Sequence, residues 1–95
     1  MNSAMNTTTD PSSPTIQLLY FARVAELTGC RAETYALPQG ASVTGSDLLA
    51  QLGQRHPDLA GASRLRLAVN QTHAKPSVVI HAGDEVAVFE PVTGG

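Results

Sequence analysis

The chain has 95 residues, of which 42% are hydrophobic, and a formal net charge of -2 with only six Lys and Arg. This length excludes two globular domains, and the hydrophobic fraction excludes a wholly disordered chain. Nucleic-acid-binding proteins usually carry a clustered basic surface, so neither DNA nor RNA is an expected partner.

The chain has a single cysteine, Cys30, which cannot form an internal disulfide. Nothing therefore indicates an oxidising compartment, and we predict a cytoplasmic protein. No apolar run approaches the roughly 18 residues of a membrane helix, and the N-terminus lacks a basic region followed by an apolar core. We expect a soluble protein with no membrane partner.

Residues 1–14 consist mainly of Asn, Ser, Thr and Pro and have almost nothing to bury. They cannot offset the entropy cost of being ordered, so we predict a flexible polar tail followed by one domain over 15–95. In that domain, residues 16–21 carry apolar side chains on both faces of a strand, which favours a central position in a sheet.

Residues 24–29 predict a short turn or helical piece that ends at Gly29, and residues 31–37 predict a second strand returning antiparallel to the first. The start of the main helix has a clear signal. Thr44 is placed to cap it together with Asp47, and Val43 is placed to pack on Leu48.

The main helix has an apolar stripe formed by Leu48, Leu49 and Leu52, and His56-Pro57 ends it. It also contains Gly45 and Gly53, each of which weakens a helix by about 1 kcal/mol relative to alanine, so packing must supply the difference.

The second half of the domain begins with a half-exposed strand over 65–69 and a turn at Asn70-Gln71. Residues 75–82 predict a short edge strand or an irregular connection. Gly83-Asp84 then turns into a last strand over 85–89. The elements indicate an α+β domain in which one main helix lies across a mixed sheet of four to five strands.

The chain ends in Phe89-Glu90-Pro91-Val92-Thr93-Gly94-Gly95. Pro91 cannot donate to a strand ladder, so pairing is expected to stop there. Two terminal residues without Cβ can lie extended in a slot too narrow for other side chains. Such an end is suited to presenting its own carboxylate to another enzyme.

This ending, with Val69-Asn70-Gln71 and Gly83-Asp84-Glu85 upstream, resembles the small subunit of molybdopterin synthase, a sulfur-carrier family of the ubiquitin-like β-grasp group. The resemblance covers about residues 15–95. Two positions depart from the family pattern: Glu90 stands where a proline is usual, and Ala25 stands where an arginine is common. Any contact of that arginine is expected to be lost or to have moved to Arg23.

The resemblance implies a chemistry at Gly95. An E1-like adenylating enzyme uses ATP to form an acyl-adenylate there, and sulfur supplied through a sulfurtransferase replaces AMP to give a thiocarboxylate. The large synthase subunit, in a heterotetramer, then transfers this sulfur to a pterin precursor and forms the molybdopterin dithiolene. The chain itself is expected to bind no cofactor and to be a co-substrate with no catalytic groups of its own.

If the last strand lies beside the first, parity divides their side chains between two faces. One set meets the helix, and the other points to a face that no remaining element covers, unless residues 75–82 shield it. An uncovered apolar patch beside a protruding tail favours docking. The expected partner-binding residues are Leu19, Phe21, Phe89, Pro91 and Val92, with Thr93 and Gly94 inserted into the partner.

Other candidate sites have simpler interpretations. The three histidines, His56, His73 and His81, lack metal-ligand spacing and are interpreted as solvated loop residues, so no metal is expected. Asp84-Glu85 is interpreted as a turn and a strand start because adjacent strand side chains point to opposite faces. Cys30 lacks a basic cluster or a second cysteine and is interpreted as a bystander.

Two alternative functions remain open from the sequence. The first is a sulfur carrier for another pathway, such as thiamine thiazole synthesis, which would use the same fold and the same end. The second is a ubiquitin-like module that conjugates to lysines or only binds a partner. Asn70-Gln71 and the Phe89-x-Pro91 pattern favour the molybdopterin branch.

Overall fold

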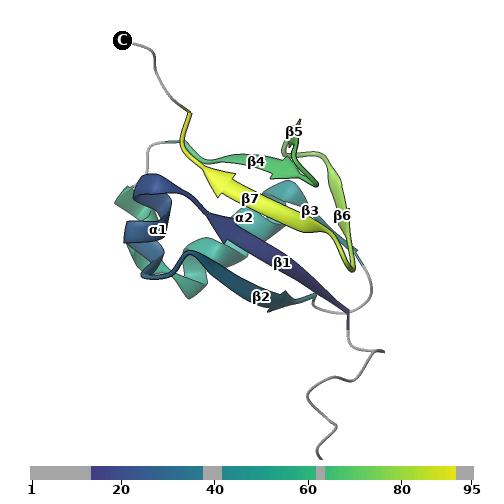
Figure 1. Cartoon of the computed structure of the whole chain (residues 1–95), viewed down its shortest axis with the longest axis horizontal. Coiled ribbons are helices and arrows are strands. Elements are labelled where there is room, and N and C mark those ends of the chain that lie inside the picture. The colour runs from purple at the N-terminus through teal and green to yellow at the C-terminus, as the bar shows by residue number, and fades with distance from the viewer. Residues whose placement is uncertain (1–13, 38–41, 62–63, 92–95) are drawn as a thin grey trace, which may run out of the picture.

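The computed structural model describes residues 14–37, 42–61 and 64–91. A five-stranded mixed sheet in the order β2-β1-β7-β4-β5 forms the body of the fold (Figure 1). Its strands are β1 (Thr15–Tyr20), β2 (Ala32–Ala36), β4 (Arg66–Val69), β5 (Thr72–Ala74) and β7 (Glu85–Phe89). The predicted α+β fold with a β-grasp sheet is confirmed. The predicted tail over 1–14 lies outside the described residues except for Pro14.

The last strand lies beside the first in the middle of the sheet, as the resemblance to the sulfur-carrier family implies. Strand β7 pairs parallel with β1 and antiparallel with β4, while β2 pairs antiparallel with the other edge of β1. In Figure 1 both β1 and β7 point toward the short helix α1, and the longer helix α2 lies behind the sheet. The register places Leu18 opposite Val86 and Tyr20 opposite Val88.

These inward residues form the core. Ile16, Leu18, Tyr20, Val86 and Val88 are each at most 2% exposed. They pack in one cluster with side chains from the helices and loops, and the other fully buried members of that cluster are Val24, Leu48, Leu52 and Ile80. Strand β1 therefore places one set of side chains in the core and turns the other set away from α2.

The segment after β1 is a helix, α1 (Ala22–Thr28), which resolves the predicted choice between a turn and a helical piece. It ends at Gly29 in the left-handed conformation with φ 82°, which glycine adopts without a Cβ penalty. Val24 anchors α1 in the core. Beside the main helix the fold thus has a second, short one.

The main helix α2 (Gly45–Arg55) begins as predicted. The hydroxyl of Thr44 accepts a hydrogen bond of 3.2 Å from the backbone amide of Asp47. Val43 and Leu48 are both buried in the core cluster on either side of this cap. A five-residue 3₁₀ helix, η2 (Pro57–Gly61), follows after His56 and contributes Leu59 to the core.

The sequence pattern did not predict two of the short strands, β3 (Ser42–Thr44) and β5. The Asn70-Gln71 turn leads into β5, which is the edge strand of the main sheet. Of the two alternatives for residues 75–82, the short strand is correct: it is β6 (Val79–His81), which pairs with β3 in a separate two-stranded sheet. Three-residue strands are too short to show a period of two, so their pairing depends on tertiary contacts.

Two of the three histidines, His73 and His81, are exposed as predicted, but their assignment to loops is wrong. His73 and His81 lie in β5 and β6, and the ring of His56 is half-buried.

The Nε2 atom of His56 lies 2.7 Å from Glu33 Oε2, and the Tyr20 hydroxyl donates to the same oxygen at 2.5 Å. Burial raises the pKa of Glu33, but hydrogen bonds from Tyr20 and His56 outweigh it and leave that pKa below its usual value. The cluster ties β1 and β2 to the end of α2.

No described helix has the length and apolar character needed to cross a membrane.

The two glycines of α2 give the first testable prediction. A Cβ at Gly45 would lie 2.6 Å from Leu67 Cδ1 and 3.0 Å from the backbone oxygen of Pro76, whereas a Cβ at Gly53 would meet nothing within 4 Å. Gly45→Ala is therefore expected to lower the free energy of unfolding by about 1–3 kcal/mol through overpacking. Gly53→Ala should raise it by roughly 0.5–1 kcal/mol through helix propensity.

Urea unfolding of both variants measures the difference. Equal gains in stability for the two alanine variants would contradict the close packing of Gly45 against β4 and the loop before β6.

Candidate functional site at the end of β7

The face of the main sheet turned away from α2, here called the open face, is built by the outward residues of its strands. Register places Leu19 opposite Ala87 and Ala87 opposite Ala68, and Phe89 and Phe21 continue β7 and β1 beyond these pairs. Figure 1 views the sheet from this side, with α2 behind it. The predicted apolar patch therefore lies where β1 and β7 end together.

The side chains of this patch differ in exposure. Phe21 is 51% exposed, whereas Leu19 and Phe89 are half-buried. The predicted shield, residues 75–82, does not cover them, because its backbone carbonyls at Pro76 and Val78 accept hydrogen bonds from the first turn of α2. Partial cover comes from β5 instead, since the His73 ring meets Phe89 edge-on with ring centroids 5.4 Å apart.

Phe21 is presented by an unusual backbone corner. It caps α1 with extended backbone angles, and the next residue, Ala22, has φ 48° in the left-handed region that non-glycine residues seldom adopt. Such a conformation costs of order 1–3 kcal/mol and is held only where surrounding contacts determine it. Strain of this kind often marks a functional position, and here it turns the chain so that Phe21 projects from the open face.

Glu90, which stands where the family usually has a proline, forms an ion pair in the structure. Glu90 lies 3.9 Å from the guanidinium of Arg23 in the first turn of α1, and the pair is partly exposed. An exposed ion pair of this kind contributes at most about 1 kcal/mol. It joins the end of β7 to α1 around a hollow of about 410 Å³ lined by Phe21, Ala22, Arg23, Phe89, Glu90 and Pro91. It is called the tail-root hollow here, because Pro91, which follows β7 and precedes the terminal residues, lines it.

At the opposite end of β7, the motif residues of the sequence interlock. Asn70 and Gln71 both have positive φ, 50° and 72°, as a tight hairpin turn requires. The Asn70 side chain donates to Asp84 Oδ1 at 3.1 Å and accepts from the backbone amide of Glu85 at 3.0 Å. The backbone amide of Asn70 also donates to the backbone carbonyl of Glu85 at 2.7 Å. This Asn70–Asp84 clasp fixes the start of β7.

The clasp also accounts for the chemistry of Asp84. Hydrogen bonds from the backbone amide of His81 and from the Asn70 side chain hold the pKa of Asp84 below its ordinary value of 3.8. The carboxylate therefore has a structural role in the turn, as the sequence predicts for this position. Asp84-Glu85 forms no paired-carboxylate site, because Glu85 already belongs to β7.

The remaining candidates form no reactive group. Across the described ranges, no cluster of three or more His, Cys, Asp or Glu side chains is placed to hold a metal ion. Cys30 is a half-buried free thiol. Four predicted functional residues, Val92, Thr93, Gly94 and Gly95, lie outside the described residues. Phe21, Phe89 and Pro91 line the tail-root hollow at the end of β7, and Leu19 lies on β1 opposite Ala87.

Comparison with known proteins identifies the family. A family model described as the ThiS family matches residues 18–95, which include the terminal glycines. The chain belongs to the ThiS family. The resemblance drawn from the terminal residues is thereby confirmed, and the match includes both departures, at Ala25 and Glu90.

Curated ThiS-family relatives support the same assignment. The chain is 37% identical over 84 residues to the molybdopterin synthase sulfur carrier subunit of Homo sapiens, covering 84% of this chain and 93% of the relative. It is 36% identical over 80 residues to the subunit of that name in Escherichia coli, covering 84% and 99%.

Solved structures share the fold. SAMP1 from Haloferax volcanii aligns with a TM-score of 0.69 at 28% identity, covering 85% of this chain and 99% of that one. A Pyrococcus furiosus protein aligns with a TM-score of 0.73 at 28% identity, covering 84% and 100%.

The shifted pKa of Asp84 gives a prediction for stability against pH. A carboxyl whose pKa is lowered on folding stabilises the fold above its unfolded value, 3.8, and this contribution is lost as pH falls through the folded value. Between about pH 6 and pH 2, Asp84→Asn should therefore show a smaller loss of unfolding free energy than the wild type. Asn70→Ala should lie between the two, because one of the two donors to Asp84 remains.

Urea unfolding at a series of pH values provides the measurement. A stability difference between the wild type and Asp84→Asn that is the same at every pH would show that the clasp does not stabilise the ionised carboxylate.

Proposed function

We propose that this chain is a sulfur carrier and the small subunit of molybdopterin synthase. One observation carries the proposal: the family match extends through Gly95, and the curated relatives, which are at least 32% identical, are named molybdopterin synthase sulfur carrier subunits. The apolar open face beside the end of β7 supports it, because a subunit that offers its own terminus needs a surface by which a partner holds it.

The reaction at Gly95 follows from the weak electrophilicity of a carboxylate. In the proposed sequence, the Gly95 carboxylate attacks the α-phosphorus of ATP held by an E1-like adenylating enzyme, and pyrophosphate leaves. Sulfur delivered through a sulfurtransferase then displaces AMP and leaves a thiocarboxylate. The large synthase subunit transfers that sulfur to a pterin precursor, and a second thiocarboxylate supplies the second sulfur of the dithiolene. This chain contributes the reacting end and the docking surface, and the partners contribute ATP binding and catalysis.

The proposed docking residues are those at the ends of β1 and β7. Phe21 offers the largest exposed apolar side chain there. It shares one hollow with Leu19 and another with Phe89 and Pro91. Exposed aromatic side chains of this kind are common anchors of protein interfaces. Val92, Thr93 and Gly94 would then span the distance between this surface and the partner's active site, with Gly94 and Gly95 narrow enough for a tight channel.

A second candidate function is supported by likeness to solved structures that carry a modifier name. A Haloferax volcanii structure with a TM-score of 0.69 and 26% identity carries the name small archaeal modifier protein 1. A ubiquitin-like modifier would use the same activated Gly95 but would transfer the acyl group to a lysine amine. A carrier for another pathway, such as thiamine thiazole synthesis, also remains open, and the cytoplasmic location stays a prediction.

Adding one alanine after Gly95 tests the proposed chemistry. The extra residue moves the reacting carboxylate away from the position that the adenylating enzyme recognises, so sulfur loading should fall by at least about 100-fold, a change of roughly 2.8 kcal/mol. An alanine inserted directly after Met1 is the matched control, and it should leave loading unchanged.

The measurement is ATP- and sulfurtransferase-dependent formation of the thiocarboxylate by the purified activating enzyme. Normal loading of the chain extended at Gly95 would contradict the proposal. Loading followed by transfer to lysines, with no dithiolene formed by the large subunit, would favour the modifier function.

A further inference from the structure

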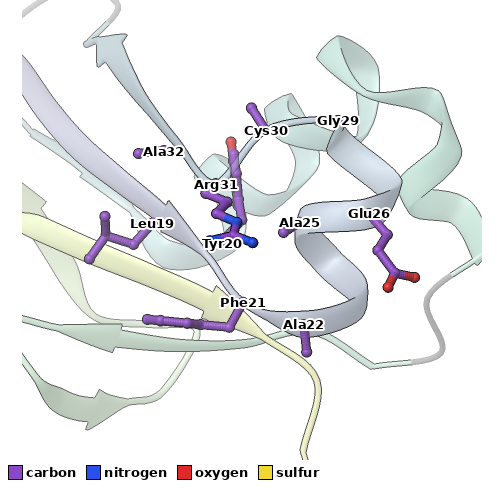
Figure 2. Close-up of a pocket in the computed structure, with 10 residues that line it drawn as sticks. All are labelled: Leu19, Tyr20, Phe21, Ala22, Ala25, Glu26, Gly29, Cys30, Arg31 and Ala32. Atoms are coloured by element: carbon purple, nitrogen blue, oxygen red, sulfur yellow. The ribbon is translucent and has the colours of Figure 1, made fainter.

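A second hollow lies beside the tail-root hollow. It has a volume of about 790 Å³ and opens between the end of β1, helix α1 and the start of β2. Its apolar lining includes Leu19, Phe21, Ala22, Ala25 and Ala32. Figure 2 shows these side chains around the hollow, with the small methyl groups of Ala25 and Ala32 on opposite sides of it. The alanines leave space that a larger side chain would fill.

One cation lies in this apolar setting. The Arg31 side chain extends from the residue just before β2 into the hollow. Glu26 also lines the hollow, with its carboxylate on the outer side of α1 (Figure 2). Arg31 is exposed and forms no ion pair with any carboxylate in the described part of the chain. By contrast, Arg23 and Arg55 both pair with glutamates.

An arginine among apolar side chains selects a particular kind of occupant. Its planar guanidinium binds a carboxylate through two parallel hydrogen bonds, and it binds most strongly where neighbouring apolar groups exclude water. The walls around Arg31 would meanwhile bury an aliphatic or aromatic side chain. The complementary ligand is therefore a polypeptide segment in which an apolar residue stands next to an Asp or Glu.

Continuity with the tail root indicates which protein supplies that segment. Phe21 and Ala22 line both hollows, so one surface runs from Arg31 past Phe21 to Pro91. A partner that docks on Phe21 at the tail-root hollow therefore also lies against the second hollow.

We propose that the Arg31 hollow receives an acidic, apolar segment of the large catalytic synthase subunit, an inference that rests on the proposed function. Arg31 then acts as a specificity-determining residue of the interface. Arg31 lines the hollow together with Phe21 and the strained Ala22. The partner would therefore meet a charged side chain, Arg31, and an aromatic one, Phe21, in the same hollow.

The test compares three variants of the full-length chain for binding to the purified large subunit. Arg31→Ala should raise Kd by roughly 10–100-fold, the loss expected for hydrogen bonds to a charged group, and Arg31→Glu should raise it further. Arg31→Lys should lie between Arg31→Ala and the wild type, because lysine keeps the charge and loses the planar fork.

The matched control is Arg64→Glu. Arg64 is also exposed and also lies in a hollow, together with Leu49 and Lys75, but that hollow is at the opposite edge of the sheet from β2. The same change of charge there should alter Kd by less than about two-fold. All variants should keep the wild-type circular dichroism and thermal midpoint, since only the backbone oxygen of Arg31 takes part in a described hydrogen bond, from Tyr20.

Ionic strength gives a second measurement. The wild-type Kd should rise with salt concentration, and the Arg31→Ala Kd should rise less steeply, because the screened contact has been removed.

Three results would overturn the assignment. Binding of Arg31→Glu with wild-type affinity would show that the hollow is not occupied by an acidic segment. An equal loss in Arg64→Glu would show a general effect of net charge. A loss confined to the adenylating enzyme would show that the occupant comes from that protein. If the wild-type chain itself does not bind the large subunit, the proposed function fails, and this inference fails with it.

Discussion

The parallel pairing of β1 with β7 is the constraint on which the rest of the structure depends. Because the two strands run side by side in the same direction, their inward residues fill the core and their outward residues share the open face. The carboxyl ends of both strands also lie side by side. There β1 leads through Phe21 into α1, and β7 leads through Glu90 and Pro91 toward the C-terminus. The exposed Phe21 and the start of the tail are thus neighbours as a direct result of register.

The motif residues divide into structural and functional groups along β7. Asn70, Asp84 and the Glu85 backbone interlock at the start of the strand and hold its register. The strain at Ala22 and the contact between Arg23 and Glu90 shape the other end. The likeness to known family sequences therefore rests partly on residues that keep β7 in place, while the proposed chemistry belongs to Gly95, beyond the end of the strand.

Much of this arrangement follows from local sequence patterns. The apolar alternation of β1 and β7, the Thr44 cap and the Asn70 turn were predictable because each depends on neighbouring residues or on a period of two. The pairing of β6 with β3, the half-buried His56 and the left-handed Ala22 were not, since each depends on contacts between segments distant in the sequence. Arg31 is likewise an ordinary surface arginine in sequence, and only the fold places it over an apolar hollow.

The intact mass of the protein shows whether Gly95 carries sulfur. The chain should be purified under reducing conditions from cells that contain its activating enzyme, and fragmentation should locate any change. We predict a mass increase equal to the exchange of one oxygen for one sulfur, confined to Gly95. An unmodified carboxylate at Gly95 in every preparation, with the activating enzyme present and active, would contradict it.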